Sequence, residues 1–279
     1  MRPLDPPTID LTIVFDTCIE SITPPRKHRL LGAKNTLVDF DALYDDLAQT
    51  ADLNLFEPHE YVGGSKATKK DMTYVYSAKL VGGAGRHFYD LIRASAPNAT
   101  CPYCGQRKVT TLDHFLPKSE FPSFAISPRN LVPCCSDCNK SKGSSYAEQA
   151  DDQFIHPYYD KTDHHPWLVA DVVESAPIAV TFRVVHHSEM DDATFIRIKN
   201  QFNELQLGQL YASHAAEELS NLRHVLSVLM KLSGSTAVYT YLSETAESYA
   251  DNQPNSWNTA FYTALAQSRW FREEGCAML

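Results

Sequence analysis

Two pairs of cysteines, and an Asp-His pair between them, are the residues of this chain best suited to chemistry. Each cysteine pair has the C-x-x-C spacing, Cys101 with Cys104 and Cys135 with Cys138. One such turn can present two thiolates to a metal, and two turns complete the tetrahedral shell that Zn²⁺ prefers. The sequence therefore predicts a structural zinc site, with thirty residues folded between the two knuckles.

The segment between the knuckles predicts a short strand, a loop and a helix. Residues 109–112 are β-branched or apolar and predict a strand that ends at Asp113 and His114. Three prolines keep the following segment out of regular helix. Residues 136–142 predict a short helix that ends at Gly143, because glycine readily adopts the backbone conformation found after helix ends.

The order of these residues resembles the HNH endonuclease family, whose ββα-metal core often lies inside a zinc-binding treble clef. The matching residues are Asp113-His114, Asn130 and Asn139, with eight residues between the two asparagines, as in the family. The third signature position holds Asn where other members have His, so the chain resembles an H-N-N variant. Four cysteines and three polar positions agree at once, which makes the resemblance specific over residues 101–143.

The resemblance implies a role for each of these four residues. His114 would be the general base, because a neutral imidazole can take a proton from water near neutral pH. Asp113 and Asn139 would hold a catalytic metal, and their oxygen atoms favour Mg²⁺ or Mn²⁺ over Zn²⁺. Asn130 would fix the loop that carries His114. Cleavage of a phosphodiester would leave a 5′ phosphate and a 3′ hydroxyl.

Positive charge is concentrated around this core, although the whole chain is acidic. The net charge of −9 argues against a protein that coats nucleic acid indiscriminately. Residues 64–142 contain twelve Lys or Arg against five Asp or Glu, a net charge of +7 that leaves −16 for the rest. Such a region suits phosphate binding, although a chance fluctuation of solvated charges would also produce it. The phosphate-binding candidates are Lys118, Arg129, Lys140, Lys142, Arg86 and Arg93.

The other cysteines and histidines have plainer interpretations. Cys134 stands beside a knuckle, but the C-x-x-C spacing selects Cys135, so Cys134 is expected to pack as a small residue. His156 could approach the metal or pack against aromatic neighbours, and packing is favoured. The tandem histidines at 164–165 and 186–187 have no Cys or carboxylate at ligand spacing and are expected to be exposed loop residues.

The whole chain is expected to have an α+β fold, in which small strands flank the HNH core and a helical region follows it. We expect an N-terminal α/β segment at 1–100, the core at 101–143, a loop and strand extension at 144–193 and a helical part at 194–279. Strands are expected at 11–15, 167–173 and 178–184. Helices are expected at 38–52, 86–93, 195–211 with a break near 207–208, 214–231, 237–249 and 256–271.

Composition favours a cytoplasmic protein. A chain of 279 residues with 43% hydrophobic content can bury one large or two modest domains. No run approaches the roughly 20 apolar residues of a membrane span, and the N-terminus lacks the apolar core of a signal peptide. The odd number of remaining cysteines fits reduced thiols better than a disulfide framework.

Other functions fit the same residues. A zinc-stabilised module that binds nucleic acid without chemistry would keep the four cysteines but need neither His114 nor Asn139. The positive region could also dock a protein within a larger complex.

The patterns CPYC, DH-x-L-P-K-S and NLVP before C-x-x-CN further resemble effectors of bacterial anti-phage and retron-associated systems, often encoded beside an ATPase. That resemblance implies a DNA-cleaving defence effector with an ATPase partner.

Overall fold

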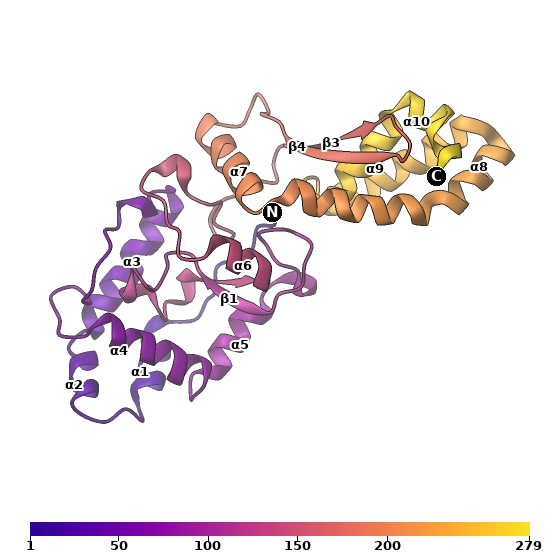
Figure 1. The fold of residues 1–279 in the computed structure, drawn as a ribbon. Helices are drawn as coiled ribbons and strands as arrows, with labels where there is room; N and C mark the ends of the chain where they lie inside the picture. The colour runs from indigo at the N-terminus through magenta and orange to yellow at the C-terminus, as the bar shows by residue number, and fades with distance from the viewer. The chain divides into compact units, whose positions relative to one another are not determined.

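Residues 1–161 form one structural unit and residues 162–279 a second one in the computed structural model, which describes the whole of residues 1–279 (Figure 1). The elements of the first unit are α1 (Leu11–Ile19), α2 (Arg26–Leu31), α3 (Lys34–Gln49), α4 (Lys69–Tyr74), its π-helical continuation η2 (Val75–Val81), α5 (Arg86–Ala94), β1 (Thr111–His114), β2 (Leu131–Cys134) and α6 (Ser136–Lys142). The elements of the second unit are β3 (Leu168–Val173), β4 (Ala179–Val184), α7 (Asp192–Glu204), α8 (Leu207–Asn252), α9 (Trp257–Gln267) and α10 (Arg269–Glu273).

The strand expected at residues 11–15 is wrong, because this segment forms the helix α1. β-Branched residues favour a strand locally, but the buried positions recur at helical spacing, and Ile13 between them is 58% exposed. Asp10 caps the helix by accepting a hydrogen bond from the Thr12 amide at 2.6 Å. Residues 1–100 contain no strand, so this segment is helical and not α/β. The buried side of α1 consists of Leu11, Val14, Phe15, Cys18 and Ile19.

The core of the first unit surrounds the β1–β2 hairpin. The strands pair antiparallel, with Asp113 opposite Val132 and His114 opposite Leu131. α5 packs against both strands, and α6 packs on β1 (Figure 1). The predicted helix at 136–142 is confirmed, and it ends where Gly143 takes a φ of +57°, a conformation that favours glycine. The hairpin and α6 together make the ββα arrangement that the sequence resemblance implied.

The second unit packs a hairpin against helices. The expected pairing of the strands near 167–173 and 178–184 is confirmed, with β3 packed on α9 and β4 on α8. The expected boundary near Thr194 therefore falls inside this unit, and the finer four-part division stays a prediction. The separate helices expected on either side of residues 232–236 are continuous in α8 except for a kink at Gly234, whose φ is +69°.

Two arginines of α2 hold α4 in place through Asp71. The Asp71 carboxylate is buried and accepts from Arg29 Nε and Nη2 at 2.9 and 2.8 Å and from Arg26 Nε at 3.0 Å. It also completes a capping box with Thr68 at the first turn of α4. The hydrogen bonds from Arg29, followed by those from Thr68 and Arg26, hold the pKa of Asp71 well below its ordinary value of 3.8.

We expect Asp71→Asn to lower the free energy of unfolding by about 2 kcal/mol, because both arginines lose their charged partner. A carboxylate with a lowered pKa stabilises fully above its ordinary pKa of 3.8 and less as the pH falls further. The difference between wild type and variant in urea denaturation should therefore narrow below that pH. Asp90→Asn is the matched control, because Asp90 forms a solvent-exposed pair with Arg86, and exposed pairs contribute little to stability. Equal losses in the two variants would contradict this account.

Candidate active site

The four knuckle cysteines lie together and are buried. The Sγ atoms of Cys101, Cys104, Cys135 and Cys138 all lie within 4.8 Å of one another. Four thiolates around Zn²⁺, each about 2.3 Å from the ion, would lie about 3.8 Å apart, so this donor set fits a tetrahedral zinc ion. The Arg107 amide donates to Cys104 Sγ at 3.3 Å, and the Cys138 amide donates to Cys135 Sγ at 3.4 Å. Both knuckles therefore have the sulfur-directed amides that stabilise thiolate ligands.

Cys134 is buried but does not belong to this cluster. Its Sγ donates to the Cys135 carbonyl at 3.2 Å, although the thiol also lies within hydrogen-bonding reach of the Cys101 and Cys135 thiols. This placement agrees with the expected packing role. The two knuckle segments are also joined outside the cluster, because Arg107 near the first knuckle forms an ion pair of 2.8 Å with Asp137 of the second.

A cavity of about 380 Å³ lies beside the hairpin and brings most of the predicted catalytic residues together. Asp113, His114 and Asn139 line it, and so does Lys118. Asn130 does not line the cavity. Three further lining residues on α4 and η2 were not predicted from the sequence: Lys69, Thr73 and Tyr76. Their spacing of four and then three residues places them on one helical face, and this pattern could have indicated them.

His114 lines the cavity and is held as a neutral imidazole. Its Nε2 lies 3.0 Å from the Ala125 carbonyl oxygen, which can only accept, so Nε2 carries the proton and Nδ1 keeps its lone pair. Burial, with a smaller effect from Lys118, lowers the pKa of His114 from 6.5 to about 3. The ring also packs edge-on against Tyr76, with ring centroids 4.5 Å apart. The imidazole is therefore neutral at neutral pH, with Nδ1 unprotonated.

Asn130 fastens the loop that orients His114. Its Oδ1 accepts from the Leu116 amide at 2.7 Å, and its Nδ2 donates to the carbonyls of Leu116 and Phe124 at 2.9 and 3.2 Å. These bonds tie both ends of the loop 116–124, which leads directly to the Ala125 carbonyl. The fully buried amide satisfies backbone groups that water cannot reach. This geometry suits a positioning residue.

Asp113 and Asn139 provide the oxygen atoms that could hold a divalent cation. Asp113 Oδ2 accepts from Tyr103 Oη at 2.9 Å and lies 3.2 Å from Lys142 Nζ. Asn139 Nδ2 donates to the Leu112 carbonyl at 3.3 Å, which leaves Oδ1 for a cation. One carboxylate and one amide oxygen, with room for water in the cavity, fit a hard ion such as Mg²⁺ or Mn²⁺. Burial raises the pKa of Asp113, and Lys142 and Tyr103 oppose that rise.

The six predicted phosphate contacts have different surroundings. Lys118 is half-buried in the cavity wall with its Nζ 5.1 Å from the Tyr76 ring centroid, and Lys140 is exposed on α6. The two arginines of α5 share one carboxylate, because Arg86 and Arg93 lie 2.9 and 3.3 Å from Asp90. A phosphate would have to compete with that partner.

Two of these six residues are poorly placed for a phosphate. Arg129 pairs with Asp41 and, at 3.1 Å, with Asp45 of α3, which lie far away in the sequence. Lys142 is 3% exposed, and its Nζ donates to the His114 carbonyl at 2.9 Å. The phosphate contact at Lys142 stays a prediction, and the charge of this lysine already balances that of the buried Asp113 carboxylate.

His156 packs in the core, as favoured from the sequence. Its Nε2 lies 3.0 Å from Tyr44 Oη, and its Nδ1 accepts from the Tyr158 amide at 3.2 Å. The ring stacks at 4.1 Å on Phe115, and the residue is 2% exposed. His156 does not line the cavity.

The second unit contains a histidine cluster that the sequence analysis assigned to plain loops. His165, His187 and Glu189 have ligand atoms within 4.8 Å of one another. The statement that no carboxylate accompanies these histidines is therefore wrong, because the fold brings Glu189 to His165 at 3.5 Å. The three side chains are of the types that hold divalent ions, and the contact between Glu189 and His165 also fits a plain polar pair.

Comparison with known proteins identifies the core. Residues 101–145 match the family model described as HNH endonuclease. Together with the hairpin, α6 and the four-cysteine cluster, this match defines an HNH endonuclease domain, and the expected α+β fold with a helical C-terminal region is confirmed. The chain belongs to the same family as Protein ea31 of Escherichia phage lambda, with 30% identity over 262 residues that cover 88% of this chain and 84% of that protein.

A second relative is similar over a shorter length. The chain is 26% identical to Septu protein PtuB of Bacillus thuringiensis over 121 residues, which are 41% of this chain and 46% of that protein. No solved structure matches the chain significantly. The helices are all too short or too polar to cross a membrane.

We expect purified protein to contain about one zinc ion per chain, bound by the four clustered thiolates. Cys138→Ala should lose this zinc and unfold at a lower temperature, because a structural zinc contributes directly to folding. Metal analysis and thermal denaturation measure both effects. Cys134→Ala is the matched control and should keep its zinc, since Cys134 lies outside the cluster. Zinc loss in the Cys134 variant with retention in the Cys138 variant would reverse the assignment.

Lys142→Met should lower the free energy of unfolding by about 3 kcal/mol, because it leaves the Asp113 carboxylate buried without its cation. Lys140→Met, on the same helix but exposed, should change stability by less than about 0.5 kcal/mol. Chemical denaturation of the two variants provides the comparison. A Lys142 variant of unchanged stability that binds nucleic acid less tightly would instead support the predicted phosphate contact.

Proposed function

We propose that this protein is a metal-dependent endonuclease that hydrolyses phosphodiester bonds of nucleic acid, with DNA as the substrate. The observation that carries the proposal is that one cavity brings together a neutral His114, the oxygen donors Asp113 and Asn139, and the cation of Lys118. The match to the HNH endonuclease family supports the same reaction class.

In the proposed reaction, His114 Nδ1 takes a proton from a water molecule as the water oxygen attacks phosphorus. The bond from phosphorus to the 3′ oxygen breaks, and the departing oxygen takes a proton from a second water molecule, so the products are a 5′ phosphate and a 3′ hydroxyl. Asn130 keeps the imidazole oriented through the Ala125 carbonyl, and Lys118 lies where it can attract a phosphate oxygen. A divalent ion held by Asp113 and Asn139 would supply positive charge for the phosphate and the leaving oxygen.

The biological role that we propose is anti-phage defence within the cytoplasm, with an ATPase as a partner. The motif resemblance and the similarity to Septu protein PtuB support this role. The family also has a member in phage lambda, so similarity alone does not assign it. Protection of cells from phage that is lost with His114→Ala, together with copurification of an ATPase, would support the role. Nuclease activity that is fully regulated in the isolated chain would count against the partner.

His114→Ala should reduce cleavage of supercoiled plasmid at least about a hundred-fold in Mg²⁺ or Mn²⁺, because the general base is lost. Gel analysis of nicked and linear products measures cleavage, with EDTA as the metal-free control. His224→Ala, which removes an exposed histidine of α8, is the matched control and should cleave like wild type. The zinc content of each variant shows that the fold is intact.

Three outcomes separate the candidate functions. Metal-dependent nicking that disappears in the His114 variant supports the endonuclease. Binding without cleavage, unchanged in that variant, would favour the zinc-stabilised binding module. Neither cleavage nor binding would direct attention to a protein partner for the positive region.

A further inference from the structure

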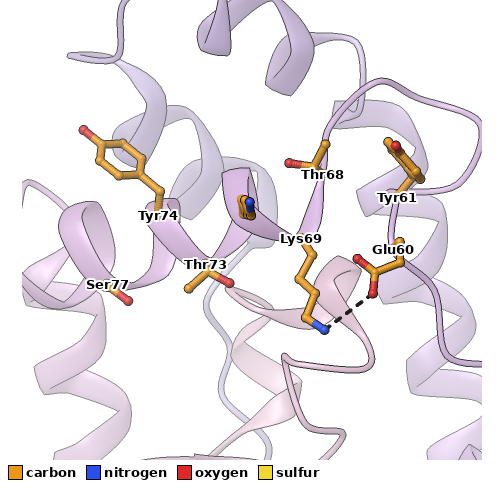
Figure 2. A pocket seen from close by; sticks show the side chains of 8 residues that line it. Glu60, Tyr61, Thr68, Lys69, Thr73, Tyr74 and Ser77 are labelled. Atoms are coloured by element: carbon orange, nitrogen blue, oxygen red, sulfur yellow. Dashed lines mark ion pairs between the residues drawn. The ribbon is translucent and has the colours of Figure 1, made fainter.

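A second cavity adjoins the catalytic one on the outer side of α4. Its volume is about 820 Å³, within the range of sites that hold small ligands. Lys69 and Thr73 line both cavities. The lining residues are Glu60, Tyr61, Thr68, Lys69, Lys70, Thr73, Tyr74 and Ser77, which Figure 2 shows as sticks. We call this cavity the α4 groove.

The helix presents polar groups toward the α4 groove at regular intervals. Lys69, Thr73 and Ser77 stand four residues apart along α4 and η2, a spacing that places them on one helical face. Figure 2 shows the Thr73 and Ser77 side chains pointing to the same side of the helix. Ammonium and hydroxyl groups in such a row are the side-chain donors that proteins use on phosphate oxygens.

Aromatic and cationic groups surround the other side of the α4 groove. Tyr61 is 58% exposed, so its ring is open to a ligand. The Arg26 guanidinium lies 4.0 Å from the Tyr74 ring centroid, and the Lys79 ammonium lies 5.7 Å from it. Lys70 is exposed on the same stretch. The groove therefore combines cations with an open aromatic ring, as single-stranded nucleic-acid sites do.

We propose that the α4 groove binds a single-stranded segment of the nucleic acid next to the phosphate that is cleaved. This inference rests on the proposed endonuclease function, because Lys69 and Thr73 line both the groove and the cavity of His114 and so place the two next to each other. Phosphates contact the row of Lys69, Thr73 and Ser77, and an unpaired base stacks on Tyr61. Bases within a duplex are already stacked on both faces, so they leave no face for Tyr61.

Glu60 limits binding at the α4 groove. Its carboxylate lies 3.6 Å from Lys69 Nζ and is 73% exposed, so it occupies the cation that a phosphate would use (Figure 2). Glu60→Gln keeps the shape of the side chain and removes the competing charge. Single-stranded binding should become about three-fold tighter, which corresponds to an exposed ion pair of ordinary strength.

The test measures binding without cleavage. Fluorescence anisotropy with a labelled single-stranded DNA oligonucleotide, and with the duplex of the same sequence, uses protein that carries His114→Ala and no added Mg²⁺. Lys69→Ala, Lys70→Ala and Tyr61→Ala should each raise the Kd for the single strand about ten-fold. The two lysine variants should also reduce the salt dependence of Kd, and the tyrosine variant should not. Lys231→Ala, an exposed lysine of α8, is the matched control with an unchanged Kd.

The outcomes separate this inference from the proposed function. Wild-type plasmid cleavage together with unchanged Kd values in all three groove variants overturns the groove and leaves the endonuclease standing. Groove-dependent binding in a wild-type protein that never cleaves overturns the endonuclease and leaves the groove as a binding site. Equal affinity for duplex and single strand, with no effect of Tyr61→Ala, overturns the single-stranded occupant. Absence of binding to either DNA overturns the groove inference whatever the cleavage assay shows.

Discussion

The four clustered thiols impose the constraint on which the active site depends. Each strand of the β1–β2 hairpin has four residues, and α6 has seven. A two-stranded hairpin of this length is at best marginally stable alone in water. The two knuckles lie at the two ends of the segment that contains the hairpin, so a shared zinc ion would close that segment into a loop. Closing a loop restricts the unfolded chain, which stabilises the folded one.

Charge balance around the cavity depends on residues that are distant in the sequence. Asp113 is buried but has Lys142 beside it, while His114 is buried with no carboxylate partner and stays neutral. The adjacent side chains thus have opposite electrostatic surroundings within one strand. This contrast supports the roles proposed above, a cation at the carboxylate and proton transfer at the imidazole, because paired titratable groups in active sites commonly divide their roles.

The part of the candidate site that the sequence could predict consists of residues close to one another along the chain. The knuckles, the Asp-His pair and Asn139 lie close to one another along the chain in a pattern with a known use, and the structure gathers them as the resemblance implied. Partners from far along the chain could not be predicted. Arg129 pairs with α3 more than eighty residues earlier, and Glu189 approaches His165 only in the folded hairpin unit. The strand predicted at residues 11–15 is wrong because β-branched composition acts locally, whereas the helical period of buried positions extends to Cys18, outside that stretch.

The peptide bond between Cys138 and Asn139 joins the two candidate metal sites directly. One residue is a thiol ligand of the four-cysteine cluster, and the next offers its amide oxygen to the cavity. A change in the first turn of α6 therefore moves a donor of each site at the same time, and the two ions would be thermodynamically linked.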